Sequence, residues 1–162
     1  MNIYSLPNAI GSLCVLYTGV FVFWSNRKSR LHASFFAFCI IMLIWLGSYA
    51  VAFSTSDPQI ATFLVRLACV AVVYTTPMLY LFAALYLNKF NSEKKYIYAC
   101  FAIFTMTFFL FIFSNLFLGD YYKYPWGYYS KAGPLHPLYL LLGSLTWGRG
   151  LFLFIDKKMW QS

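Results

Sequence analysis

The sequence has little charge of either sign. Only 10% of its 162 residues are Asp, Glu, Lys or Arg, and only four of those are acidic. Soluble domains carry about 25% charged residues, so this chain has too few polar groups to cover a compact fold in water. Apolar residues, counting Tyr and Trp, make up 62%, and aromatic residues make up 23%. This composition excludes an ordinary soluble domain and favours a protein embedded in lipid.

The sequence also lacks the motifs of the common enzyme classes. It has no HExxH, no GxSxG, no P-loop and no Gly-rich dinucleotide turn. The four cysteines form no CxxC pair, and we expect them to pack as small apolar side chains. They are Cys14, Cys39, Cys69 and Cys100. We therefore expect no catalytic residue, no metal site and no cofactor.

Long apolar runs are abundant. A helix needs about 20 apolar residues to cross the hydrocarbon core. Five runs approach this length: residues 3–24, 31–53, 60–87, 96–118 and 138–155. The runs are continuously apolar rather than alternating, which argues against an outer-membrane barrel. The fold class predicted is all-α, a polytopic transmembrane helix bundle of about five spans that forms a single domain over residues 1–162.

The distribution of basic residues predicts the orientation of the bundle. Eight of the ten basic residues outside the spans lie in the first loop, the third loop and the tail: Arg27, Lys28, Arg30, Lys89, Lys94, Lys95, Lys157 and Lys158. Short cytoplasmic loops carry an excess of Lys and Arg, so these segments are expected inside. The N-terminus is then outside and the C-terminus inside. The first run is not expected to be a cleaved signal peptide, because its basic cluster follows it. The net charge of +8 needs no nucleic-acid partner.

Two arginines and one proline within the spans are candidates for function. Intramembrane ionisable residues often mark functional sites. Arg66 and Arg149 can instead snorkel to the interface or bind neighbouring carbonyl groups, and both alternatives remain open. Pro77 stands in the middle of the third run, where it removes a helix hydrogen bond and produces a kink. That kink is either a static packing feature or a hinge that relays motion.

The fourth loop, residues 119–137, is rich in Tyr, Trp, Pro and Gly. Tyr and Trp belong at the membrane–water boundary, where the ring is covered and the polar tip stays wet. We expect a compact, non-helical lid on the outer face of the bundle. It is either an aromatic belt or one wall of an external ligand pocket that includes Trp126 and Tyr128. His136 is a further candidate in this loop, although a lone His is more often structural.

The order of these features resembles a known family. Trp45 lies near the centre of the second run, Arg66 near the start of the third and Pro77 at its middle; the fourth loop then reads WGYY at 126–129 and GPLHP at 133–137. The sequence resembles, over about residues 5–142, the N-terminal seven-transmembrane sensor region of bacterial histidine kinases. The resemblance implies a multi-pass sensor in the bacterial cytoplasmic (inner) membrane. We expect ligand binding at the outer face by Trp126, Tyr128, His136 and Arg66, and relay through Pro77 and Trp45.

The sequence departs from the family in two ways. Five spans are predicted where the family has seven, and the chain ends at Ser162 without a kinase core. Expected partners are therefore membrane lipids and either a second copy of the chain or a separate histidine kinase or cytoplasmic signalling domain, unless the chain is a truncated sensor. The alternative function is a subunit of a transporter or of a multi-subunit membrane complex. A membrane-embedded enzyme is disfavoured by the missing acidic and His clusters.

Overall fold

The computed structural model describes residues 3–159, with the side chains of residues 3–155. A short 3-10 helix, η1 (Ile3–Ser5), leads into α1 (Leu6–Ser25), and α2 (Arg30–Ala52) follows. The remaining elements are α3 (Pro58–Val72), α4 (Thr75–Tyr86), α5 (Phe90–Phe113), β1 (Leu118–Tyr124), β2 (Gly127–Ala132) and α6 (His136–Met159). The described part of the chain contains five helical segments long and apolar enough to cross a membrane. The predicted helical bundle of five spans is confirmed.

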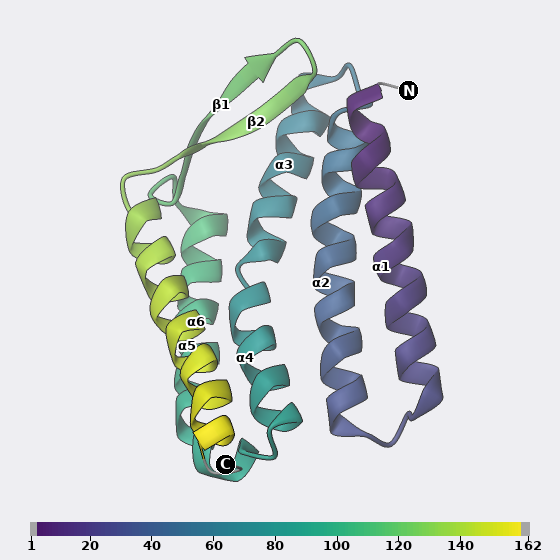
Figure 1. The fold of residues 1–162 in the computed structure, drawn as a ribbon. Helices are drawn as coiled ribbons and strands as arrows, with labels where there is room; N and C mark the ends of the chain where they lie inside the picture. The colour runs from purple at the N-terminus through teal and green to yellow at the C-terminus, as the bar shows by residue number, and fades with distance from the viewer. Residues whose placement is uncertain (1–2, 160–162) are drawn as a thin grey trace.

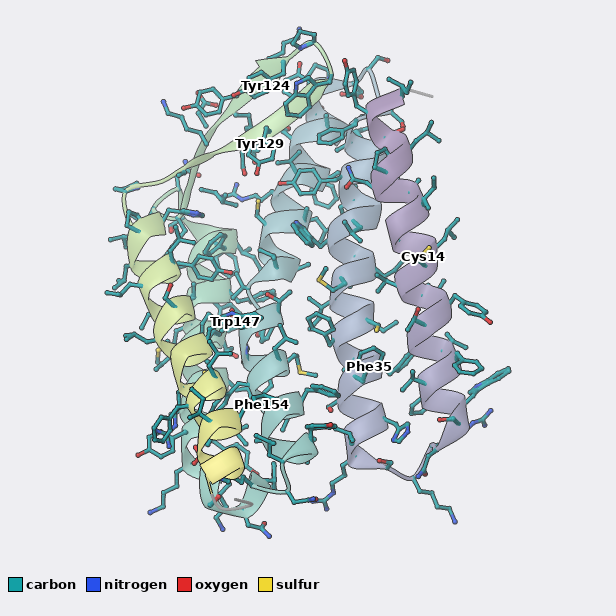
Figure 2. The ribbon with its side chains drawn as sticks, in the orientation of Figure 1. Cys14, Phe35, Tyr124, Tyr129, Trp147 and Phe154 are labelled. Carbon is teal, nitrogen blue, oxygen red and sulfur yellow. The ribbon has the colours of Figure 1, made fainter. Side chains whose placement is uncertain are left out.

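The helices form a bundle with α1 at one flank and α5 and α6 at the other (Figure 1). Between them, α2 packs on α1, and α3 and α4 continue one another through the middle of the bundle. Only 11% of the apolar stretch of α1 and 6% of that of α6 is buried, and many side chains of α1 project outward from the bundle (Figure 2). Helices with such exposed apolar faces suit a lipid environment.

The third span is divided by a break at Val73 and Tyr74, between α3 and α4. Pro77 has no N–H to donate to the carbonyl of Val73, four residues earlier, and its ring crowds that carbonyl. The hydroxyl of Thr75 donates to the Val72 carbonyl at 2.7 Å. The predicted kink within a single third span agrees with the continuous path from α3 to α4 (Figure 1).

The predicted bounds of the fourth span, residues 96–118, are wrong. The helix runs from Phe90 to Phe113 instead. Its first turns include Lys94 and Lys95, which are exposed and can extend to the interface while their apolar stems cover the helix. At the other end, Ser114 has extended backbone angles (φ −138°, ψ 159°) and ends the helix before the strand.

The fourth loop folds as an antiparallel β-hairpin, which the all-helical prediction missed. Tyr124 pairs with Gly127 across a two-residue turn, and Tyr122 pairs with Tyr129. Gly127 has a φ of +142°, a conformation that side chains rarely adopt. The base of the hairpin is closed by two further bonds, because the amides of Gly133 and Leu135 donate to the carbonyls of Phe117 and Leu116 at 2.9 and 2.8 Å.

The hairpin lies across the end of the bundle where the N-terminus is found, and the loops α1–α2 and α4–α5 lie at the opposite end (Figure 1). The basic residues of those two loops are therefore gathered at one end of the molecule. Lys157 and Lys158, the basic tail in the predicted topology, have side chains outside the described residues.

Candidate functional site

The tip of the hairpin packs on the end of α2. The ring of Tyr129 stacks on that of Tyr49, with centroids 5.9 Å apart. Trp126 stands edge-on to Phe53 at 5.2 Å and stacks on Tyr124 at 4.7 Å with the planes 4° apart. Figure 2 shows Tyr124 and Tyr129 on the hairpin at this end of the bundle. Such ring pairs contribute about 0.5–1.5 kcal/mol each beyond the area they bury, so the tip is held to the helices rather than free in solvent.

Beneath these rings, α2 and α3 meet in a small buried cluster. Its buried members are Tyr49, Ala52, Val65 and Ala68, and Trp45, Phe53, Leu64, Tyr121 and Tyr128 pack against it. Ala52, Val65 and Ala68 are fully buried. The hairpin therefore contributes Tyr121 and Tyr128 to the same core that joins α2 to α3.

A polar contact also joins the hairpin to α3. The thiol of Cys69 lies 3.3 Å from the hydroxyl of Ser130 on β2 and 3.8 Å from the hydroxyl of Tyr49 on α2. Cys69 is three residues before the end of α3 at Val72. A displacement of the hairpin would thus reach α3 close to the break in the third span.

Arg66 binds the end of α5. Its Nε donates to the carbonyl of Phe111 at 3.3 Å, and one Nη donates to the carbonyl of Ser114 at 3.2 Å and to Oδ1 of Asn115 at 3.3 Å. The last carbonyls of a helix lack intrahelical partners and carry partial negative charge. The sequence alone leaves open whether Arg66 extends to the interface or binds neighbouring carbonyl groups. In the structure it binds the carbonyl groups. Asp57, the acidic residue closest to Arg66 along α3, instead caps that helix by accepting from the amide of Gln59 at 2.8 Å.

A second charged cluster lies at the opposite end of the bundle and joins α4, α5 and α6. Glu93 accepts from the Tyr80 hydroxyl at 2.6 Å and from Nη2 and Nε of Arg149 at 2.8 and 3.1 Å. The guanidinium also donates through Nε to the Tyr80 hydroxyl at 2.8 Å and lies over the Tyr96 ring at 3.6 Å. Arg149 is therefore paired within the bundle rather than only extended toward the interface.

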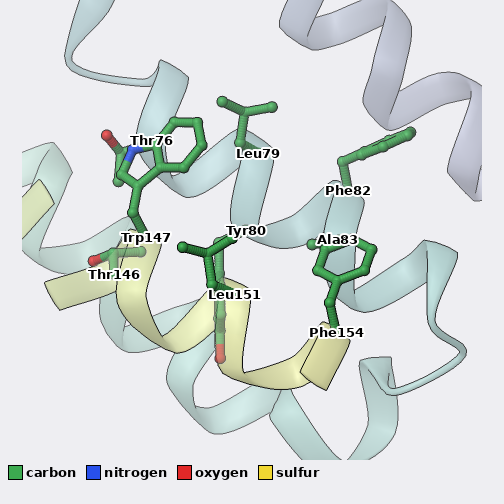
Figure 3. A pocket seen from close by; sticks show the side chains of 10 residues that line it. Thr76, Leu79, Tyr80, Phe82, Ala83, Thr146, Trp147, Leu151 and Phe154 are labelled. Atoms are coloured by element: carbon green, nitrogen blue, oxygen red, sulfur yellow. The ribbon is translucent and has the colours of Figure 1, made fainter. Parts of the chain in front are cut away.

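Tyr80 also lines a cavity between α4 and α6 of about 230 Å³ (Figure 3). Trp147 and Phe154 of α6 stand on one side of the cavity, and Leu79 and Phe82 of α4 stand on the other. Its walls are almost entirely apolar, apart from the hydroxyls of Thr76, Thr146 and Tyr80. The cavity thus borders both the Glu93 cluster and the start of α4 near Pro77.

A family model for the N-terminal 7TM region of histidine kinase matches residues 8–160. The chain belongs to this family. Comparisons with curated proteins and with solved structures found no match. The matched region extends past the end of the resemblance predicted over about residues 5–142 and includes the whole of α6. The matched region is a sensor region and not a catalytic domain, so the chain is a multi-pass membrane sensor region of the histidine kinase type.

Within this 7TM-type sensor region, the structure does not bring all of the predicted site residues together. Trp126 and Tyr128 are together at the hairpin tip. His136 begins α6, beyond the base of the hairpin, where its ring lies 5.8 Å from that of Tyr139. Trp45 packs under the hairpin. Pro77 is buried at the start of α4, below Arg66 along the third span.

Sequence reasoning missed Glu93 and Tyr80 altogether. Glu93 was placed in a basic loop, whereas it lies in the first turn of α5 with a side chain only 10% exposed. One signal was available, because Glu93 is the sole glutamate of the chain and stands among lysines. A single acidic residue near a span that faces an unpaired arginine in another span is a candidate ion pair.

Proposed function

We propose that this sensor region binds its ligand at the hairpin end of the bundle and relays the event through the break between α3 and α4. The observation that carries the proposal is the contact of β2 with α3 through Ser130 and Cys69, three residues before α3 ends. Trp126 and Tyr128 are the proposed ligand contacts, with Trp45 and Pro77 on the proposed path inward.

The charge distribution supports an outward-facing hairpin in the bacterial cytoplasmic membrane. The loops that carry Arg27, Lys28 and Lys89, and the first turns of α5 with Lys94 and Lys95, lie at the other end of the bundle. Basic loops stay on the cytoplasmic side during insertion. The basic residues of the hairpin are Lys123 and Lys131. Their Nζ atoms lie over the rings of Tyr128 and Tyr122, at 5.9 and 5.8 Å from the ring centroids.

The break supports the proposed relay. An unbroken helix moves largely as one rigid element. A break at a proline is a point where the two halves of a helix can change the angle between them. The cytoplasmic half, α4, reaches the Glu93 cluster through Tyr80. A shift of α4 would thus act on α5 and α6 at the end where a kinase, supplied by the same protein or by a partner, would receive it.

A Trp126→Ala variant tests the proposal in cells that carry the native kinase pathway. Phosphorylation of the cognate response regulator is measured under conditions that activate the wild type, and membrane levels of the protein are measured in parallel. The matched control is Tyr17→Ala, which removes an aromatic ring that is 72% exposed on α1. We expect Trp126→Ala to lose the response at normal protein level and Tyr17→Ala to keep it. A full response from normally inserted Trp126→Ala would remove the hairpin from the mechanism.

A further inference from the structure

Arg66 lines a cavity between α2, α3 and α5 that the hairpin contacts do not use. The cavity has a volume of about 440 Å³ and includes Ile44, Leu67, Tyr74 and Phe108 in its wall. Small-molecule sites usually measure roughly 300–1,000 Å³. Phe63, Ile44 and Ile112, which also line it, are 66%, 40% and 38% exposed, so it is reached from the surrounding lipid.

The charge of Arg66 is not neutralised by any carboxylate in the part of the chain that the structure describes, where the one ion pair joins Arg149 and Glu93. The three hydrogen bonds of the Arg66 guanidinium use Nε and Nη2, so Nη1 makes none to the described residues. Through Nη1, the guanidinium that lines this apolar cavity can still donate charge-assisted hydrogen bonds to a carboxylate or phosphate group.

The cavity places this cation at one end and apolar surface along the rest. Arg66 is eight residues from the start of α3, or about 12 Å along the helix axis, and lies at the level where α5 ends. From there the lining residues descend along α3 through Leu67 and Val70 to Tyr74. Tyr74 lies at the break and shares a hydrogen bond of 3.1 Å with Thr105 of α5.

We propose that this cavity binds a single-chain anionic amphiphile, with its carboxylate on Arg66 and its apolar chain along α3 toward Tyr74. Charge complementarity determines the head group, and the almost wholly apolar wall determines the tail. The volume is near the lower end of the range for ligand sites, which suits one chain rather than the two of a diacyl lipid. The site is distinct from the hairpin tip, and its occupancy does not depend on the proposed signalling.

The test is equilibrium binding of radiolabelled palmitate to the full chain in nanodiscs of zwitterionic lipid, with methyl palmitate as the uncharged competitor. Because charge-assisted hydrogen bonds are lost with the ester, we expect palmitate to compete at least about tenfold better than methyl palmitate. Arg66→Gln should weaken palmitate binding by a similar factor. Since Arg66 also binds the end of α5, this variant alone could fail through misfolding.

Ile44→Trp keeps Arg66 and its hydrogen bonds while filling the cavity from its lipid side, and Ile10→Trp adds the same ring at an α1 position that is 58% exposed. We expect palmitate binding to be lost in Ile44→Trp and retained in Ile10→Trp. Equal binding by these two variants, or equal competition by the acid and its ester, would overturn the proposal. Competition by a diacyl anionic phospholipid as strong as that by palmitate would also overturn it, since the occupant would then be a two-chain lipid.

Discussion

Replacing Arg149 with Met should weaken the bundle at its basic end by a measurable amount. The substitution keeps an unbranched apolar side chain but removes the guanidinium, and with it the bonds to Glu93 and the contact over the Tyr96 ring. Glu93, with a side chain 10% exposed, would then keep only the hydroxyl of Tyr80 among its present partners. Breaking a buried ion pair in this way costs about 3–5 kcal/mol. Because Arg149 is itself 38% exposed, we expect a loss near the lower limit, about 3 kcal/mol.

The loss should depend on Glu93, and a double-mutant cycle isolates that dependence. Glu93→Gln keeps an acceptor for both Tyr80 and Arg149 but gives up the charge, so we expect it to cost about 1–2 kcal/mol. In the double variant no carboxylate is left unpaired. Its total loss should therefore be smaller than the sum of the two single losses by at least about 1 kcal/mol.

The assay is reversible unfolding in mixed micelles, in which the fraction of denaturing detergent is raised and helix content is followed by circular dichroism. Lys94→Gln is the control, because Lys94 lies on the same turn of α5 as Glu93 but is exposed; its effect should stay within about 0.5 kcal/mol. Single losses that simply add, to within about 0.5 kcal/mol, would refute the coupling of Arg149 to Glu93.

Three further predictions concern the hairpin, the break and the orientation. Gly127→Ala should open the hairpin tip to limited proteolysis, because residue 127 has a φ of +142° and a Cβ there would lie 2.8 Å from Cδ1 of Phe53. Gly148→Ala is the control and should not, because a Cβ at residue 148 would have no atom within 4 Å. Pro77→Ala should restore an amide donor and slow hydrogen exchange between residues 73 and 78; unchanged exchange would mean that Pro77 does not maintain the break. In a cysteine-free background, Lys131→Cys should react with an impermeant maleimide in intact cells and Lys28→Cys should not; the reverse pattern would invert the proposed topology.

The spans were predictable because each depends on a local property of the chain. Continuous apolar runs of about 20 residues have few folds open to them in lipid. The break in the third span was also predictable, since the missing N–H of Pro77 falls on a known carbonyl, that of Val73. The bounds of α5 were not, because Lys94 and Lys95 look like loop residues until their reach to the interface is considered.

The hairpin was missed for a different reason. Its turn contains Pro125 and Trp126 rather than the Asn-Gly or Asp-Gly pairs that usually mark a two-residue hairpin. The tyrosines on both sides have high strand propensity, but that preference depends on packing against neighbours, here the end of α2. The charged cluster was hidden because Arg149 meets Glu93 across 56 positions. The partners of Arg66 could not be seen in the sequence at all, since two of them are backbone carbonyls.

The two arginines give α5 a particular place in the proposed relay. Arg66 ties α3 to the last turn of α5, and Glu93, in the first turn of α5, ties that helix to Tyr80 of α4. The two halves of the third span are therefore attached to opposite ends of one unbroken helix, and Tyr74 at the break contacts its middle through Thr105. With both ends held, the third span has one place to bend, at Val73 and Tyr74. A movement of the hairpin that changes the angle between α3 and α4 must either strain the Arg66 contacts or shift α4 against Glu93. A shift of α4 against Glu93 would also reach α6, because Glu93 binds Arg149 of α6.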